Sequence, residues 1–542
     1  MNASLSPLAI LGIVGIYFAV LILVSFLTSR GESENEDFFL AGRKSPWPIV
    51  AIGMVGSSLS GVTFISIPGA VGGDGVNQAF SYMQVVMGYL LGYAVIALVL
   101  LPLYYRMGLT SIYEYLSSRI GRHAYKIGAF YFLLSRTIGS AFRLFLVAVV
   151  LQTFVAEPAG IPFAVTVAST IILIWLYTFR GGIKTIIVTD TLQTVCMLLA
   201  AGMTVYYVAG ALETDFMGMV GLIEQSDYSQ WFFFDGGWSD PNNFFKQFLS
   251  GALITIVMTG LDQDMMQKNL SMPNFRDAQK NMLVFSVILV FANLLFLSLG
   301  ALLYIYASTV GLAIPPSTDL LYPTIALVNL PPVAGVLFVL GIVAAAYSSA
   351  DSALTALTTS FCVDFLGMRD TDARPGAGPQ VPPTTEASSE PGYVPASPLP
   401  PSDAAPASQP NSDKRRRLLV HSGFSVLLFL VIMGFQLIND QAVINSLFKA
   451  AGYTYGPLLG LFAFGLLTRF RVRETVTVGS VEVPALIVIC LLSPIVSILV
   501  DRYSAELLGG FQFGFLILAF NGLLTFIGLI ALSEFGEQHG EE

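Results

Sequence analysis

A cluster of glycine and serine residues interrupts an apolar run that extends from about residue 48 to residue 71. The cluster reads Gly56-Ser57-Ser58-Leu59-Ser60-Gly61. Glycine costs about 1 kcal/mol in a helix interior, and serine hydroxyls compete for backbone groups, so we expect a helix to be weak here. In a bilayer the freed carbonyl groups need another partner, and broken helices use such carbonyls to hold sodium. The alternative is close helix packing, which also favours small residues.

A second cluster of hydroxyl residues lies in a later apolar run, at Tyr347-Ser348-Ser349-Ala350-Asp351-Ser352. The hydroxyls of Ser348, Ser349 and Ser352 fall on two successive helical turns, and Ala345 lies one turn earlier. Hydroxyl and carbonyl oxygens from this run and from the broken helix would form a cage of five oxygens, which suits a monovalent cation. The alternative is that each hydroxyl bonds back to the preceding turn of its own helix.

Four ionisable residues lie inside apolar runs, where such residues mark functional sites. They are Asp190, Asp351, Arg136 and Arg143. Asp190 is near the start of its run and could instead complement a helix dipole. Arg136 and Arg143 are seven residues apart, which places them on one helix face, and they could be buried partners of the two aspartates.

The composition is that of a membrane protein with many spans. The chain has 542 residues, of which 55% are hydrophobic and only 11% are charged, whereas soluble domains average about 25% charged residues. The net charge of −9 gives no indication of nucleic-acid binding. The three cysteines lie in or beside apolar runs, which favours buried packing over a disulfide framework. The first run lacks a basic flank and a cleavage site, so we interpret it as a retained span.

Thirteen apolar runs are long enough to cross a bilayer. Lys and Arg concentrate in the connections that follow odd-numbered runs, such as Arg43, Arg106, Lys268 and Arg469. Because basic loops stay in the cytoplasm, we expect the N-terminus outside and the C-terminus in the cytoplasm of an inner (plasma) membrane protein. The expected runs are 7–28, 48–71, 78–104, 126–154, 162–179, 186–209, 246–267, 282–307, 331–359, 418–437, 446–468, 482–501 and 510–533.

Two connections have unusual compositions. Residues 369–417 are rich in Pro, Ala and Ser and end in Lys414-Arg415-Arg416-Arg417. Such a composition cannot bury a core, so we expect a disordered cytoplasmic linker with a basic end at the anionic leaflet. The connection from about 211 to 245 is rich in aromatic residues, which is typical of an interfacial belt or lid.

Several motifs together resemble the sodium:solute symporter family, which includes bacterial sodium/galactose, sodium/proline and sodium/sialic acid transporters. The resemblance extends from about residue 7 to 365, and more weakly to 533. It rests on five motifs in order: Asp37-Phe38-Phe39-Leu40-Ala41-Gly42-Arg43, Thr110-Ser111-Ile112-Tyr113-Glu114-Tyr115-Leu116, Gly181-Gly182-Ile183-Lys184 leading to Thr189-Asp190 and Gln193, Gln263-Asp264-Met265-Met266-Gln267-Lys268, and the serine cluster of the ninth run.

The resemblance implies an all-helical LeuT-like fold with two inverted five-helix repeats and a broken first core helix. The repeats would cover residues 48–209 and 246–468, the second interrupted by the linker at 369–417. Residues 1–28 and 482–533 would form peripheral helices.

The resemblance also implies ion sites. The main sodium site would use the carbonyls of Gly56, Leu59 and Ala345 and the hydroxyls of Ser348 and Ser349. A second sodium site found in some members would use Asp190, Asp351 and Ser352. A serine of that second site is replaced here by Asp351, so the two carboxylates could share either a cation or a proton.

The resemblance to the sialic acid branch is closer than that to the galactose branch. Thr63 stands where the galactose branch has a glutamine, and that branch's gating tyrosine maps near Met265. The segment Leu59–Phe64 matches the carboxylate-binding segment of the sialic acid branch, and Arg143 aligns with its arginine. Ser60, Thr63 and Arg143 could therefore clamp a carboxylate. The expected solute-binding residues are Ser58, Ser60, Thr63, Tyr82, Arg143, Asp262 and Gln263.

The function that these features favour is sodium-coupled import of a small organic solute, a sugar, amino acid or carboxylate, by alternating access. Sodium is the expected coupling ion, and no organic cofactor is expected. Proton coupling on the same fold and a transporter-like solute sensor are the alternatives. An enzyme is not expected, because no nucleophile or metalloprotease motif is evident. The expected partners are the solute and the lipid bilayer, and we expect a monomer.

Overall fold

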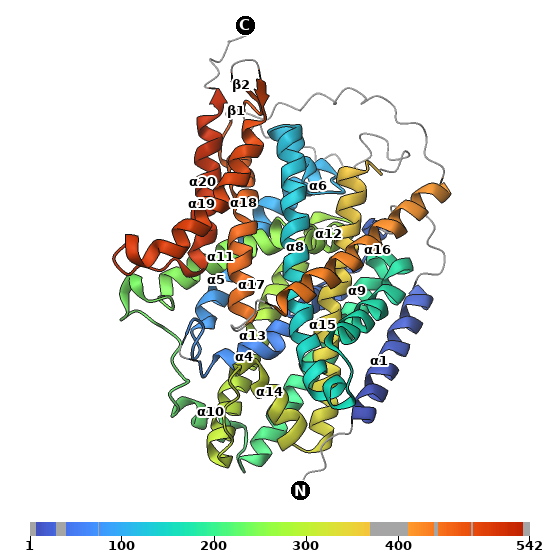
Figure 1. Ribbon diagram of the computed structural model, residues 1–542, viewed down its shortest axis with the longest axis vertical. Coiled ribbons are helices and arrows are strands. Elements are labelled where there is room, and N and C mark those ends of the chain that lie inside the picture. Colours follow the sequence, from blue (N-terminus) through green and yellow to red (C-terminus); the bar gives the residue numbers. More distant parts are fainter. Residues whose placement is uncertain are drawn as a thin grey trace, which may run out of the picture.

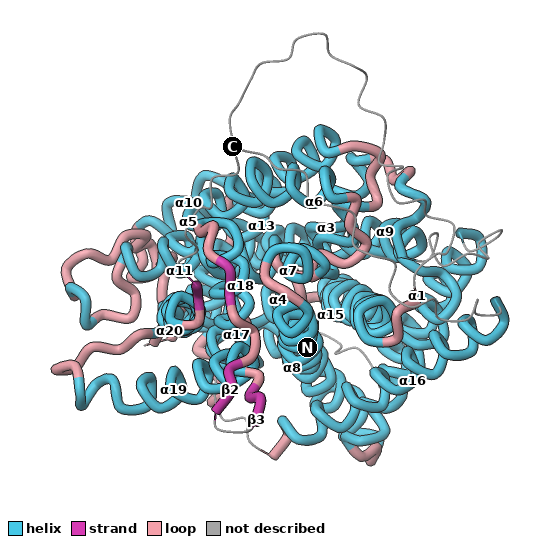
Figure 2. The backbone as a smooth tube through the Cα atoms, turned by 90° about the horizontal axis from the view of Figure 1, so that it is seen from above, coloured by secondary structure: helices cyan, strands magenta, loops and turns pink. Residues whose placement is uncertain are grey.

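The computed structural model describes residues 7–28, 39–73, 75–368, 410–437, 443–478 and 481–534. It is a bundle of tightly packed helices (Figure 1). The four longest helices are α8 (Arg122–Leu151), α9 (Phe163–Ala211), α13 (Phe275–Val310) and α15 (Pro332–Ser360). α15 lies at the centre of the bundle and contacts α1, α3, α4, α8, α9, α12 and α16. The view from above shows α1, α3, α4, α8, α9 and α16 gathered around it (Figure 2).

Shorter helices and two small two-stranded sheets complete the described structure. The strands lie near the C-terminus, where β1 pairs with β4 (Arg471 opposite Glu534) and β2 with β3 (Val476 opposite Val483), both antiparallel. The remaining elements are α1 (Pro7–Thr28), α3 (Trp47–Ser58), α4 (Gly61–Ala70), α5 (Tyr82–Val95), α6 (Leu101–Met107), α7 (Glu114–Arg119), α10 (Phe216–Glu224), α11 (Phe244–Thr255), α12 (Gln263–Leu270), α14 (Leu321–Thr324), α16 (Pro410–Phe435), α17 (Val443–Thr454), α18 (Gly456–Leu467), α19 (Ala485–Leu507), α20 (Ile517–Ala531), β1 (Arg471–Val472), β2 (Val476–Val478), β3 (Val481–Val483) and β4 (Ser533–Glu534).

The helices confirm a membrane protein with many spans. Among the described residues, nine helices are long and apolar enough to cross a membrane, and three bent helix pairs raise that number to twelve. A shorter apolar helix covers Phe163–Thr178. It is the first part of α9, which as a whole would be about 74 Å long at 1.5 Å per residue, against about 30 Å of hydrocarbon. α9 therefore contains both of the runs expected at 162–179 and 186–209, and the exact count of thirteen spans stays a prediction.

The break expected in the second run is present. α3 ends at Ser58, α4 begins at Gly61, and the two helices are bent by 54°. Leu59 and Ser60 between them are extended, with ψ angles of 97° and −178°. The glycine and serine cluster is therefore the site of a helix break, as its composition predicts.

Two further runs are also broken, which the sequence did not indicate. The helical segment Gly237–Gly260 and α12 are bent by 62°, and residues 446–454 and α18 by 47°. The Asp262 side chain caps α12 by accepting hydrogen bonds from the backbone N–H groups of Asp264 (3.0 Å) and Met265 (3.4 Å). A cap of this kind starts a new helix. The helices that would begin the two expected repeats are thus both discontinuous, as are the helices that build the site in inverted-repeat transporters.

The structure describes only the end of the expected linker at 369–417, whereas it describes the whole aromatic connection from about 211 to 245. α16 begins at Pro410, so residues 410–417 of the expected linker are helical, which corrects the predicted boundary; residues 369–409 lie outside the described part of the chain. In the aromatic connection, the Phe233 N–H donates to Gln84 of α5 (3.1 Å), and Trp231 packs edge-on against Phe80. This connection therefore lies over one end of α5, as a lid would.

Candidate functional site

A cavity of about 80 Å³ lies beside the break between α3 and α4. Its polar lining comes from the break, from three tyrosines of α5, from two arginines of α8, and from Thr255, Thr259 and Asn293. Its apolar lining comes from the break, from α11, α12, α13 and α17, and from Met258. The lining residues are Ser57, Ser58, Leu59, Ser60, Val62, Thr63, Tyr82, Tyr89, Tyr93, Arg136, Arg143, Ile254, Thr255, Met258, Thr259, Met265, Leu289, Asn293, Leu447 and Phe448. A small solute site between the two halves of the fold is the arrangement expected of a carrier.

Five of the seven expected solute-binding residues line this cavity: Ser58, Ser60, Thr63, Tyr82 and Arg143. Asp262 and Gln263 do not line it, and they have other contacts in the structure. Asp262 caps α12 and accepts a hydrogen bond from the Tyr455 hydroxyl (2.7 Å). Gln263 bonds the backbone of Ile112 and Thr110 at 3.0 and 2.8 Å. Both side chains are used to hold the bent α11–α12 pair in place.

Arg143 is a buried cation whose guanidinium is only partly hydrogen-bonded by the described residues. Its side chain lines the cavity, and the residue is only 8% exposed. Nη1 donates to Ser349 Oγ (2.8 Å), while Nε has no hydrogen-bond partner. In the part of the chain that the structure describes, no carboxylate forms an ion pair with this guanidinium. An isolated buried charge is costly, so this position favours an anionic partner that enters the cavity.

Arg136 lies seven residues before Arg143 on the same helix, α8, and has protein partners instead. It forms an ion pair with Asp264, and its Nη1 lies 3.8 Å from Asp262 Oδ2. Asp264 Oδ1 in turn lies 3.8 Å from Lys268 Nζ. The alternative that the α8 arginines pair with Asp190 or Asp351 is not found among the described residues, because the capped start of α12 brings two other carboxylates to Arg136. Both arginines line the cavity, but their environments differ: among the described residues Arg136 is paired with carboxylates and Arg143 is not.

The residues expected for the main sodium site come from two elements, the broken end of α3 and the middle of α15. The carbonyls of Gly56 and Leu59, at the broken end of α3, accept no hydrogen bond from the described part of the chain. A Cβ atom on Gly56 would lie 3.0 Å from Ser348 Oγ, so glycine allows α3 to approach α15 closely. Ser349 follows on the same turn, and Ala345 is buried one turn earlier. Freed carbonyls beside buried hydroxyls fit a sodium ion, the partner that such groups need in a membrane.

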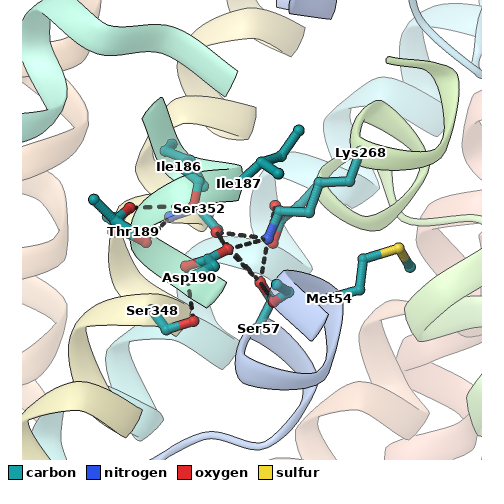
Figure 3. Close-up of polar contacts among 12 residues, drawn as sticks. Met54, Ser57, Ile186, Ile187, Thr189, Asp190, Lys268, Ser348 and Ser352 are labelled. Carbon is teal, nitrogen blue, oxygen red and sulfur yellow. Dashed lines mark hydrogen bonds and ion pairs between the residues drawn. The ribbon is translucent and has the colours of Figure 1, made fainter. Parts of the chain in front are cut away.

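The second expected ion site is only partly assembled. Asp190 accepts hydrogen bonds from Ser348 (2.8 Å), Ser57 (2.7 Å) and Ser352 (3.0 Å), and Figure 3 shows these side chains converging on it. Asp351 is turned elsewhere, since its carboxylate accepts from the Tyr177 hydroxyl (2.9 Å) and from the Ser352 N–H (2.5 Å). The structure therefore brings Asp190 and Ser352 together and leaves Asp351 beside them.

Lys268 is the residue at this site that sequence reasoning placed wrongly. The sequence pattern predicts that Lys268 lies in a basic cytoplasmic connection, yet the residue is only 1% exposed. Its Nζ lies 2.7 Å from Asp190 Oδ2 and 2.8 Å from Ser352 Oγ, and it also contacts Ser57 Oγ (Figure 3). The available signal was the spacing of Asp264 and Lys268, which are four residues apart and so lie on one helix face.

Replacing Ser349 or Ser348 with alanine is expected to raise the sodium concentration needed for half-maximal binding. Losing one hydroxyl from the cage should weaken sodium binding by about 1–3 kcal/mol, the cost of a lost buried polar partner. Equilibrium binding of ²²Na⁺ to the purified protein measures this. Ser286→Ala is the matched control, because that buried hydroxyl bonds only Leu283 of its own helix. Unchanged sodium affinity in both cage variants would remove these serines from the site.

The broken helices, the cavity between them and the buried charges define a secondary transporter with the LeuT-like fold. The structure superimposes with a TM-score of 0.74 on a solved Na⁺-coupled sialic acid symporter in a substrate-bound outward-open state, at 19% identity and with 97% of this chain and 98% of that chain covered. The agreement in fold extends over the whole length of both chains.

The sequence comparisons give the family. Residues 38–370 match the Sodium:solute symporter family, and the chain belongs to that family. Similar proteins include the sodium/sialic acid symporter SiaT of Proteus mirabilis, 22% identical over 91% of this chain and 89% of that protein. Another is the sodium/sialic acid symporter NanT of Aliivibrio fischeri, 24% identical over 86% and 84%. The chain is thus an integral membrane symporter that couples movement of a small solute to sodium.

Proposed function

We propose that the solute is a small organic anion and that Arg143 binds its carboxylate. The observation that carries this proposal is the buried guanidinium of Arg143, which lines the cavity and forms no ion pair among the described residues. A carboxylate matches the planar fork of an arginine with two parallel hydrogen bonds. The solute would thereby neutralise a charge that the protein leaves open.

The rest of the cavity complements such a solute. Ser60 and Thr63 supply hydroxyl donors from the broken segment, next to Arg143. Met258, Leu447 and Phe448 give the other side an apolar surface, which would contact the uncharged part of the molecule. Two similar proteins are named for an acid as their solute, which supports an anion here. Small-molecule sites commonly combine a few placed polar groups with an apolar wall.

Solute and sodium binding would be coupled through one hydrogen bond. Ser349 Oγ, an expected sodium ligand, accepts from Arg143 Nη1 at 2.8 Å. Sodium at the α3–α15 cage would orient the Ser349 oxygen, and a carboxylate would orient the guanidinium that bonds it. Each ligand would therefore favour the arrangement that the other needs, which is the requirement for coupled binding.

Orientation and assembly belong to the same proposal. The basic connections would face the cytoplasm of the plasma membrane, with the N-terminus outside and the C-terminus inside. The protein would work as a monomer.

The environment of Asp351 favours proton coupling as a second candidate function. Its carboxylate is fully buried, and its contacts are the Tyr177 hydroxyl and the Ser352 N–H. Among the described residues no lysine or arginine forms an ion pair with it. A buried carboxylate without a cation tends to hold a proton, so Asp351 could exchange one during transport.

A thermal-shift screen tests the proposed solute class. Purified protein would be heated with small carboxylates, such as lactate and N-acetylneuraminate, or with neutral galactose and myo-inositol, in sodium or in matched potassium buffer. A bound ligand at one hundred times its Kd stabilises a protein by about 2.7 kcal/mol. We expect stabilisation by a carboxylate that requires sodium. Equal stabilisation by the neutral sugars, or carboxylate effects that are the same in potassium, would contradict the proposal.

A further inference from the structure

We propose that the ammonium group of Lys268 is a tethered cation that takes the place of a second sodium beside Asp190. This inference rests on the proposed sodium function, because it concerns how many sodium ions the same protein binds. The resemblance implied a second ion held by Asp190, Asp351 and Ser352. The side chains found there do not fit that ion, because a lysine already occupies the position between Asp190 and Ser352 (Figure 3).

The contacts of the Lys268 ammonium are those of a complete cation site. It donates to Asp190 Oδ2 at 2.7 Å and to Ser352 Oγ at 2.8 Å, and it contacts Ser57 Oγ. An ammonium has three N–H donors and no acceptor, so these three oxygens satisfy it fully. Asp264 lies farther off, at 3.8 Å. A carboxylate and two hydroxyls are also the oxygen ligands that a hard cation takes, so the ammonium and a sodium ion would compete for the same oxygens.

The local fold fixes Lys268 at this position. The bend after Gly260 turns α12 into the protein, and Lys268 lies on the second turn of that helix, four residues after Asp264. Its three contacts come from α3, α9 and α15, which converge at the main sodium cage. The whole residue is 1% exposed. Withdrawing a paired lysine from such a site would leave both charges buried and unpaired, which is costly.

The tethered cation sits directly beside the main sodium site. Asp190 Oδ2 bonds Lys268, while its Oδ1 accepts from Ser348, a hydroxyl of the main cage. One carboxylate therefore links the two positions, and Lys268 supplies the positive charge that a second sodium would bring. The chain would bind one sodium ion, at the α3–α15 cage.

Equilibrium binding of ²²Na⁺ to the purified full chain, at alkaline pH where protons do not compete, tests this inference. We expect one sodium per chain and a Hill coefficient of one for the wild type. Lys268→Met keeps the length of the side chain and removes its charge, so we expect two sodium ions per chain. Adding Asp190→Asn to that variant should return the number to one.

Lys246→Met is the matched control. Lys246 is also buried, but its Nζ donates to the Gln512 carbonyl (2.9 Å) and lies over the Phe511 ring, away from the ion cage. This variant should keep one sodium. Lys268→Gln would replace Lys268→Met if the latter failed to fold.

The outcomes separate this inference from the proposed function. Two sodium ions on the wild type, or one on a folded Lys268→Met or Lys268→Gln variant, would overturn the tethered cation. No sodium on the wild type, with a sodium-independent carboxylate effect in the thermal-shift screen, would overturn sodium coupling itself, and the tethered-cation inference with it.

Discussion

Replacing Arg143 with glutamine is expected to abolish the sodium-dependent stabilisation of the protein by a carboxylate solute. Glutamine keeps hydrogen-bonding capacity but is shorter, and it removes the charge that faces the cavity. Removing one partner of a buried charge pair costs about 2–5 kcal/mol, which corresponds to a loss of affinity of about 30-fold or more. The measurement is the solute concentration that gives half-maximal thermal stabilisation in sodium buffer.

Two controls separate recognition of the solute from general damage. Arg143→Lys keeps the charge but loses the planar fork, so its affinity for the carboxylate should fall between those of the wild type and Arg143→Gln. Lys280→Gln removes an exposed charge whose partner is Asp277 on the same helix, and it should bind solute like the wild type. Solute binding that survives in a folded Arg143→Gln variant would show that the carboxylate binds elsewhere.

Gly251→Ala is expected to lower the thermal stability of the protein strongly. A Cβ atom on Gly251 would lie 2.1 Å from the carbonyl oxygen of Val85, and one on Gly88 would lie 2.1 Å from that of Phe248. α5 and α11 therefore touch backbone to backbone, as membrane helices do through small residues. Because a backbone cannot move aside as a side-chain tip can, the methyl group must push the helices apart, at a cost of about 1–3 kcal/mol or more.

Gly202→Ala is the matched control for this change. Gly202 lies within α9, and nothing lies within 4 Å of the position that its Cβ would take. The same substitution there should be neutral or stabilising by up to about 1 kcal/mol, because alanine favours helix more than glycine does. The melting temperatures of the two variants should shift in different directions. A Gly251→Ala variant as stable as the wild type would show that the α5–α11 contact is looser than described.

The α5–α11 contact also affects the cavity, because residues of both helices line it. Tyr82, Tyr89 and Tyr93 of α5 face it, as do Thr255 and Thr259 from α11 and the turn that follows. Any separation of the two helices would widen one wall of the solute site. A partly folded Gly251→Ala variant should therefore lose solute affinity together with stability.

The broken helix and part of the site could be predicted from composition. The glycines and serines between Gly56 and Gly61 weaken a helix by their own nature, and α3 ends where they begin to accumulate. The hydroxyl run at Ser348–Ser352 is compatible either with bonds back to its own helix or with a polar site, and the structure shows Ser348 and Ser352 donating to Asp190. These signals depend only on local composition, so they predict the break without any knowledge of tertiary contacts.

The position of Lys268 could not be predicted in the same way. A lysine at the end of an apolar run normally lies in a loop, and that rule assumes that the helix continues straight. The bend between Gly260 and Gln263 turns the next helix inward and buries Lys268 against Asp190. The bend depends on Asp262 acting as a helix cap and on its contact with Tyr455, almost two hundred residues later. Such a contact is not visible in a single sequence.

Uptake of a labelled carboxylate, chosen from the thermal-shift screen, into proteoliposomes tests the central claim most directly. The vesicles would hold the purified full chain and would be given either an inward sodium gradient or an inward proton gradient. Sodium-coupled symport of an anion predicts accumulation above the external concentration with the sodium gradient alone, lost when a sodium ionophore collapses it. Accumulation that follows the proton gradient and is indifferent to sodium would contradict the account.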